Sequence, residues 1–221
     1  MKLLNLFCAA SIVTLLAAGC SNEKTSAPVP AAPAANATTP TPAGQAEVAV
    51  IETSEGQLVV EFWPDTAPET VANFKKLARS GFYDGTSFHR IIDGFMIQGG
   101  DPLTKDASQE AVWGTGNPGY QIKGEVSNQS DRHHVRGVIS MANSGSPDTA
   151  GSQFYICLAD LPQLDGGYTT FGKLIRGDDA LTKLGKSPVK INPYDPRQEM
   201  SRPINRVGLT SIKIVPADSV K

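Results

Sequence analysis

The run FHRIIDGFMIQGGDP, which begins at Phe88, constrains the fold most, because two short apolar segments flank an Asp-Gly pair typical of a tight turn. This pattern predicts an antiparallel hairpin. Side chains alternate along a strand, so Phe88, Arg90 and Ile92 are predicted to share one face. Met96 and Gln98 are predicted to share a face of the second strand. A guanidinium, a thioether and an amide are therefore expected to converge.

Arg90 is the unusual residue of this hairpin. An arginine in a strand is more often a solvated edge residue or half of an ion pair than a functional group. Here the neighbouring sequence is densely apolar, and Gly99 and Gly100 suggest a close approach of another backbone segment. These neighbours favour a functional role for Arg90.

A second segment, SQFYICLAD from Ser152 to Asp160, also alternates with the period of a strand. One predicted face carries Gln153, Tyr155 and Cys157. The other carries Phe154, Ile156 and Leu158. The first face again combines a polar group with an aromatic ring.

Further elements flank these strands. A helix is predicted to start near Thr66 and Glu69, which have the spacing of a capping box, with Pro68 in its first turn. Its apolar stripe is Val71, Phe74, Leu77 and Ala78, and it ends at Gly81. Strands are predicted at 48–53, 57–62 and 208–215, and a short helix at 179–184.

The N-terminus has the pattern of an export signal. Lys2 precedes an apolar run over residues 3–18, which is too short for a comfortable membrane span. The run ends in LLAAGC and resembles a bacterial lipobox, which predicts lipidation at Cys20; the alternative is ordinary signal cleavage. We therefore expect a signal peptide at 1–19, a lipid-anchored Ala/Pro-rich linker at 20–46 that cannot bury a core, and a folded domain at 47–218.

Cysteine content fits this organisation. Cys8 would leave with the signal and Cys20 would be acylated, so Cys157 remains without a disulfide partner. It is predicted to be a small core residue.

Several other chemistries find little support. The three histidines lack Cys-x-x-Cys or His-x-x-x-His spacing, so no metal site is predicted. The sequence contains no GxSxG elbow and no Walker loop, and no GxGxxG motif follows a predicted strand, so neither a hydrolase nor a cofactor is expected. Lys and Arg total 20 against 22 Asp and Glu, without a basic block, which argues against nucleic-acid binding.

The chain resembles the cyclophilin family of peptidyl-prolyl isomerases, in order from about Glu47 to Val215. The segments that carry the resemblance are FHRII, GFMIQGGD, GVISMANSG, GSQFYI, LDGGYTTFGKL and SIKIV. The resemblance implies a mainly β fold, a closed eight-stranded antiparallel barrel capped by two helices, which suits the many short predicted strands. It also implies isomerisation of X-Pro peptide bonds.

The resemblance assigns roles to individual residues. Arg90 is the hydrogen-bond donor, Gln98 orients it and contacts the substrate backbone, and Asn143 holds the residue that precedes proline. The apolar cup for the proline ring is formed by Phe95, Met96, Tyr155 and Leu164, and the groove is completed by Ala142, Gln153 and Tyr168. Taken singly, each aromatic residue and Met96 would more often be ordinary core.

Three positions depart from the best-known eukaryotic members. Tyr155 replaces phenylalanine and Tyr168 replaces a frequent histidine, and both keep an aromatic ring. Gln163 replaces a tryptophan that the family associates with tight cyclosporin binding. Drug sensitivity is therefore expected to be weak while catalysis is retained.

Together these features predict an exported, lipid-anchored isomerase that acts as a monomer on Pro-containing polypeptides. In a Gram-negative cell, Ser21 after Cys20 favours the outer membrane, with the domain in the periplasm. The alternatives are a non-catalytic module that binds Pro-containing peptides and a structural lipoprotein with a decayed site. No role is assigned to the loops at 104–119 and 186–207.

Overall fold

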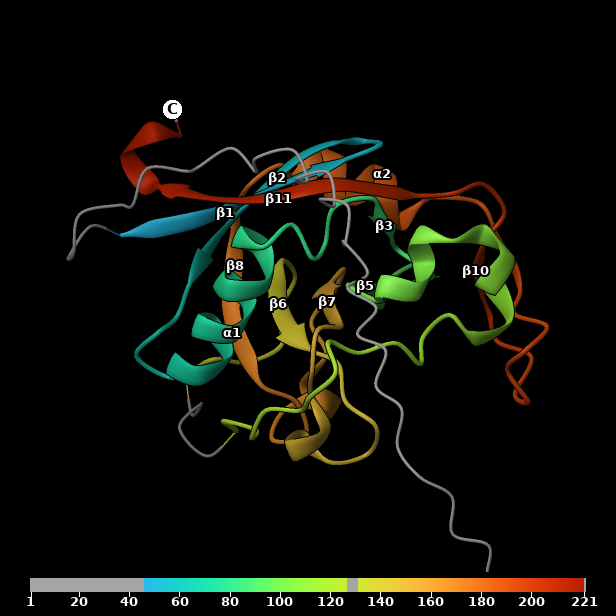
Figure 1. Ribbon diagram of the computed structural model, residues 1–221, viewed down its shortest axis with the longest axis horizontal. Coiled ribbons are helices and arrows are strands. Elements are labelled where there is room, and N and C mark those ends of the chain that lie inside the picture. Colours follow the sequence, from blue (N-terminus) through green and yellow to red (C-terminus); the bar gives the residue numbers. More distant parts are fainter. Residues whose placement is uncertain (1–45, 127–130, 221) are drawn as a thin grey trace, which may run out of the picture. The chain divides into compact units, whose positions relative to one another are not determined.

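The computed structural model describes residues 46–126 and 131–220, which form a mainly β domain (Figure 1). The predicted signal peptide, the linker and Cys20 lie outside the described residues. Nine strands form the main sheet: β1 (Glu47–Thr53), β2 (Gly56–Phe62), β3 (Thr86–Ser87), β4 (Arg90–Ile92), β5 (Met96–Gly99), β6 (Val138–Met141), β7 (Phe154–Cys157), β8 (Thr170–Arg176) and β11 (Gly208–Pro216).

All strand pairs of this sheet are antiparallel, in the order β3-β11-β1-β2-β8-β6-β7-β5-β4. The prediction of a closed eight-stranded barrel is therefore wrong. The described sheet has nine strands, and its two edge strands, β3 and β4, do not pair with each other. It is a curled, open sheet.

The opening arises where a single strand was predicted to run through Phe88. The backbone amide of Phe88 donates to Val207, whereas that of His89 donates to Gln98, so the chain changes neighbours between these two residues. Phe88 turns into the main core, and Arg90 does not. The expectation that Phe88 shares a face with Arg90 is thus wrong, because the ladder is interrupted between them.

Helix α1 (Pro68–Arg79) buries the predicted stripe against the sheet. Phe74 is fully buried and contacts the rings of Phe62, Tyr83, Phe154 and Phe171. The capping box predicted from Thr66 and Glu69 does not form, because the N-cap residue is Ala67 and has no side-chain hydrogen bond. Instead, Glu125 accepts hydrogen bonds from the amides of Glu69 and Thr70 at 3.1 and 2.8 Å.

The short helix α2 (Asp178–Gly185) extends the predicted segment by one residue at each end. The buried side chains divide into two clusters. The main core joins α1 and α2 to one face of the sheet, whereas a second cluster contains Met96, Tyr155 and Cys157. Cys157 is a buried free thiol whose pKa is raised to about 12 by burial, in agreement with the predicted core position.

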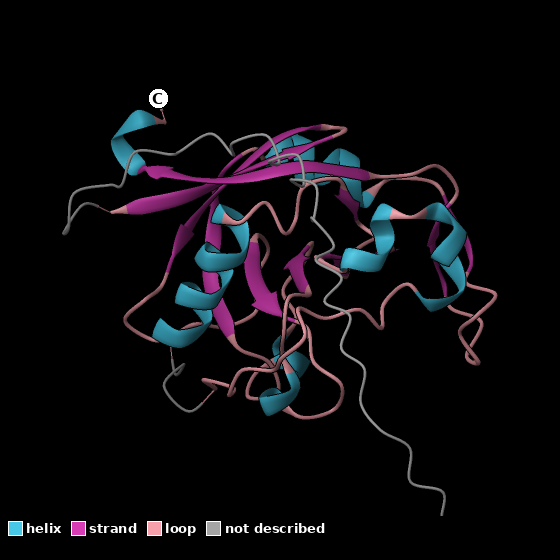
Figure 2. Cartoon of the chain, in the orientation of Figure 1, coloured by secondary structure: helices cyan, strands magenta, loops and turns pink. Residues whose placement is uncertain are grey.

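Two connections extend from the sheet. The connection from β5 to β6 begins with the 3₁₀ helices η1 (Pro102–Lys105) and η2 (Ala107–Val112) and continues as a long loop (Figure 2). The connection from α2 to β11 contains a hairpin of β9 (Val189–Ile191) and β10 (Met200–Pro203). Lys190 pairs with Glu110, so the two connections lie side by side, at the end of the domain away from α1 (Figure 1).

Three further 3₁₀ helices are η3 (Pro147–Thr149), η4 (Pro162–Leu164) and η5 (Ala217–Ser219). None of the helices described in this chain is long and apolar enough to cross a bilayer.

Candidate active site

The hairpin of β4 and β5 brings the first group of predicted residues together. Arg90 lies opposite Gln98 and Ile92 opposite Met96, and Gly94 supplies the positive φ of 69° at the turn between the strands. Because directly opposed residues of an antiparallel pair point to the same face, Arg90, Met96 and Gln98 are neighbours. This part of the sequence prediction is confirmed.

Strand β7 adds the second group. Gln98 lies opposite Tyr155 and Met96 opposite Cys157. Tyr155 and Cys157 belong to the second cluster, whereas Phe154, Ile156 and Leu158 belong to the main core. The alternation predicted for this strand is confirmed.

The face formed by these strands opens into a cavity of about 330 Å³. Its lining contains every predicted site residue except Gln153, together with one residue that was not predicted, Arg197. The lining residues are Arg90, Phe95, Met96, Gln98, Ala142, Asn143, Tyr155, Leu164, Tyr168 and Arg197. The lining thus combines apolar and aromatic side chains with two guanidinium groups and two amides.

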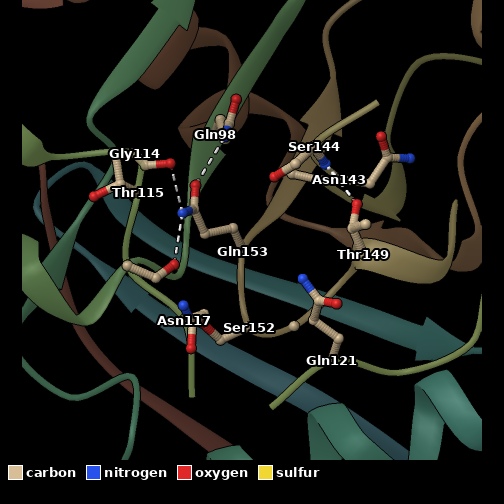
Figure 3. A pocket seen from close by; sticks show the side chains of 13 residues that line it. Gln98, Gly114, Thr115, Asn117, Gln121, Asn143, Ser144, Thr149, Ser152 and Gln153 are labelled. Atoms are coloured by element: carbon tan, nitrogen blue, oxygen red, sulfur yellow. Dashed lines mark hydrogen bonds between the residues drawn. The ribbon is translucent and has the colours of Figure 1, made fainter. Parts of the chain in front are cut away.

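Gln153 lies at an adjacent cavity of about 260 Å³, which shares Gln98, Ala142 and Asn143 with the first. Its amide nitrogen donates to the carbonyls of Gly114 and Gly116, and its oxygen accepts from Gln98 at 2.9 Å (Figure 3). The loop at 104–119, to which the sequence assigned no role, therefore forms a wall beside the site.

A buried carboxylate fixes that loop. Asp101 is fully buried and accepts hydrogen bonds from the amides of Leu103, Gly114 and Gly116. A Cβ at Gly116 would lie 2.0 Å from an Asp101 oxygen, so only glycine fits there.

The Arg90 guanidinium forms a two-point ion pair with Glu199. Its Nε and Nη2 atoms lie 2.7 and 2.8 Å from the two carboxylate oxygens, and Nη1 lies 3.7 Å from the sulfur of Met96. Hydrogen bonding from Arg90 holds the pKa of Glu199 below its usual value, so this carboxylate is ionised at neutral pH. Sequence reasoning missed Glu199 because it lies 109 positions from Arg90.

The side chains of Gln98 and Asn143, two of the predicted site residues, form hydrogen bonds with other residues of the protein. The Gln98 side-chain amide donates to Gln153. The Asn143 side chain donates to the carbonyl of Gly167 at 2.9 Å and accepts from the amide of Gly145 at 3.0 Å. The roles that the resemblance implies for these two residues stay predictions.

Aromatic rings form the floor of the cavity. Tyr155 meets Tyr168 edge to face at 5.7 Å and stacks on His134 at 6.0 Å. Burial lowers the pKa of His134, although a hydrogen bond from its Nδ1 to Asp165 at 2.7 Å opposes the shift. The ring is therefore neutral near pH 7.

His134 also contacts Ser140, with 3.2 Å between Nε2 and the hydroxyl oxygen. Asp165, His134 and Ser140 thus follow the order of a hydrolytic triad. However, Ser140 is fully buried and its hydroxyl donates to the carbonyl of Thr169, so no substrate reaches it. Within the described residues, no group of His, Cys, Asp and Glu side chains could hold a metal ion.

Comparison with known proteins gives a consistent answer. Residues 48–214 match the family model described as cyclophilin type peptidyl-prolyl cis-trans isomerase. A peptidyl-prolyl cis-trans isomerase of Helicobacter pylori is 48% identical over 138 residues, which cover 62% of this chain and 78% of that protein. A peptidyl-prolyl cis-trans isomerase of Synechococcus elongatus is 46% identical over 139 residues, which cover 63% of this chain and 86% of that protein.

A similar solved structure comes from Cryptosporidium parvum. It is a cyclophilin-type isomerase crystallised in the presence of the dipeptide Ala-Pro, with 35% sequence identity and a TM-score of 0.65. The match covers 76% of this chain and 98% of that one.

Proposed function

Because the chain belongs to the cyclophilin-type peptidyl-prolyl cis-trans isomerase family, we propose that it isomerises X-Pro bonds of exported proteins through one fixed donor, Arg90. The observation that carries this proposal is the position of the guanidinium. It lines a cavity together with the side chains of Phe95, Met96, Tyr155 and Leu164, and a carboxylate outside that lining holds it.

The chemistry of the bond explains why one donor suffices. Rotation about a planar amide has a barrier of about 18–20 kcal/mol, which arises from resonance between nitrogen and carbonyl. In the twisted transition state the resonance is lost, and the prolyl nitrogen carries a localised lone pair. A donor aimed at that nitrogen binds the transition state better than the planar ground state, and so lowers the barrier.

Arginine suits this role because its guanidinium stays protonated and presents rigid N–H donors. The apolar cup of Phe95, Met96, Tyr155 and Leu164 receives the proline ring, and Gln98 and Asn143 bind the backbone beside it. Ala142 and Tyr168 complete the same cavity. The proposed step involves no proton transfer, so the reaction needs neither a general base nor a metal.

A second candidate function is a non-catalytic module that holds Pro-containing segments. The apolar cup alone would serve that purpose. The ion pair of Arg90 and Glu199 favours catalysis, since binding alone does not require a cation with an oriented N–H edge beside the proline ring.

Turnover of a short X-Pro peptide tests the proposal. Arg90→Ala should lower kcat/KM by about a hundredfold or more, the effect of losing one pre-organised donor worth about 2.7–4 kcal/mol. Arg79→Ala is the matched control, because Arg79 is the last residue of α1, pairs with Glu47 of β1 and does not line the cavity. Full turnover by the Arg90→Ala variant would refute the role of Arg90.

The proposed location follows from LLAAGC, which ends at Cys20. We propose that the mature protein is a lipid-anchored monomer of the cell envelope, facing the periplasm from the outer membrane in a Gram-negative cell. Several acyl chains hold a protein firmly on a membrane, whereas one chain holds it only marginally. Mass spectrometry of the mature N-terminus should find acylated Cys20, and Cys20→Ala should release the protein or block its processing; an unmodified N-terminus would mean ordinary signal cleavage.

A further inference from the structure

The carboxylate that holds Arg90 comes from the hairpin of β9 and β10, which lies far from Arg90 in sequence. Glu199 directly precedes β10, and its carbonyl accepts a hydrogen bond from the amide of Asn192 at 2.8 Å, which fixes its backbone across the hairpin. The side chains of Arg90 and Glu199 are 28% and 22% exposed, so the pair is partly shielded from water. Ion pairs in such surroundings are stronger than fully solvated ones.

The ion pair leaves the Nη1 side of the guanidinium without a charged partner. Arginine has five N–H donors, and Glu199 takes one from Nε and one from Nη2. Of the other three donors, one on Nη1 points to the Met96 sulfur at 3.7 Å, a weak acceptor that a substrate can displace, and one each remains on Nη1 and Nη2. Glu199 does not line the cavity. Glu199 therefore binds the guanidinium through two hydrogen bonds without occupying the space where a proline ring would lie.

The hairpin itself is anchored beside Arg90. Arg202 of β10 is only 2% exposed, and its Nη1 donates to the carbonyl of His89, the residue before Arg90, at 3.3 Å. Its Nη2 donates to Asn192 at 3.4 Å. One buried side chain of β10 thus links the residue after β9 to the residue before β4.

The backbone just before Glu199 is unusual. Gln198 has a φ of 52°, and it is the one non-glycine residue with positive φ in the described part of the chain. A left-handed conformation is unfavourable for residues other than glycine, and it persists where surrounding contacts impose it. Here it closes the turn in which the Gln198 amide donates to Asp195, immediately before the chain delivers Glu199 to Arg90.

A second ion pair borders the first. Asp195 binds Arg197 with 2.9 Å between Oδ2 and Nη2, and Arg197 lines the cavity beside Arg90. The Arg197 side chain is 74% exposed, so water screens its repulsion of Arg90, and its positive charge helps to keep the pKa of Glu199 low.

We propose that Glu199 is a positioning residue: it fixes the Arg90 guanidinium so that its free N–H edge points into the cavity when the X-Pro bond twists. This inference rests on the proposed function, in which Arg90 is the donor. A misplaced donor loses much of its effect, because transition-state hydrogen bonds depend on pre-organised geometry.

The test compares Glu199→Ala and Glu199→Gln in the full protein, with kcat and KM measured separately on a short Ala-Pro peptide. Glu199→Ala should lower kcat about tenfold, with KM changed less than about twofold, because Glu199 acts on the donor and not on the bound peptide. The kcat of Glu199→Gln should lie between those of the unmodified protein and Glu199→Ala, since the glutamine amide oxygen can still accept one hydrogen bond. Glu47→Gln is the matched control, because Glu47 also holds an arginine, Arg79, but far from the cavity.

Arg90→Ala, measured alongside, separates the two proposals. If Arg90→Ala loses turnover and Glu199→Ala retains full kcat, the positioning role is wrong while the proposed function stands. If Arg90→Ala itself keeps full turnover, the proposed function fails. In an Arg90→Ala background, Glu199→Ala should cause no further loss of kcat; an additional independent loss, or an effect confined to KM, would overturn the positioning role. Should Glu199→Ala not fold, the Gln variant carries the same comparison.

Discussion

The family resemblance places Gln163 where the best-known eukaryotic members are expected to carry tryptophan. It is exposed on η4, next to Leu164 in the cavity lining. Glutamine offers neither the flat apolar surface nor the indole donor of tryptophan. Cyclosporin should therefore inhibit this protein weakly, and Gln163→Trp should strengthen inhibition while peptide turnover stays nearly unchanged. Inhibition constants for both forms test this; tight inhibition of the unmodified protein would contradict it.

Local alternation predicts one part of the site, and the family resemblance supplied the remaining predicted residues of the cavity lining. The period-two pattern determines which face of each strand a side chain occupies, and the pairing register of β4, β5 and β7 then brings together Arg90, Met96, Gln98 and Tyr155. Glu199 could not be found in this way. It precedes β10 in a Pro-rich connection, and only the tertiary fold places it beside Arg90.

Helix α1 illustrates how an element depends on distant residues. Its apolar stripe was sufficient to predict it, because helical spacing is a local signal. Its N-terminal cap was not, since the acceptor is Glu125, 55 positions from Thr70. The curled sheet was missed for a similar reason: no local signal marks the interruption at Phe88 and His89, which depends on partners in β5 and before β11.

Replacement of Glu125 tests the distant cap. Glu125→Ala removes acceptors for the amides of Glu69 and Thr70 and for the Thr70 hydroxyl. We expect the free energy of unfolding to fall by about 1–2 kcal/mol. Glu69→Ala, which removes the carboxylate of the capping box that does not form, should cost at most about 0.5 kcal/mol. Urea denaturation of both variants measures this, and equal losses would argue against Glu125 as the cap.

The stability of the whole domain should depend on pH through its buried histidines. Burial, together with the nearby charges of Arg202 and Arg90, lowers the pKa of His89 to about 3. An unfolded histidine has a pKa of about 6.5, so between these values the unfolded chain binds more protons than the folded one. Stability is therefore full above about pH 6.5 and falls as the pH decreases.

Each such histidine contributes a slope of up to about 1.4 kcal/mol per pH unit. His134, whose pKa is also lowered by burial, adds to the effect over a narrower range. Urea denaturation between about pH 7 and 4 should show this decline, and His89→Gln should make it shallower. A slope unchanged by that substitution would exclude His89 as a source.

Turnover should behave differently from stability. Between about pH 6 and 8 the rate should be flat and indifferent to chelators, because the proposed step moves no proton. Hydrogen bonding from Arg90 keeps the pKa of Glu199 below its usual value, so this carboxylate does not titrate there. A bell-shaped profile of kcat against pH in this range would show that an acid or base takes part.

The role of Arg90 in the twisted transition state is tested most directly on peptide that is already bound. Exchange spectroscopy on a saturated Ala-Pro peptide gives the rate of cis-trans interconversion on the protein, and titration gives the peptide Kd. For Arg90→Ala we expect the on-protein rate to fall about a hundredfold while Kd changes only a few-fold, because the donor acts on the transition state and not on the planar ground state. An unchanged on-protein rate, or a loss confined to Kd, would contradict the mechanism.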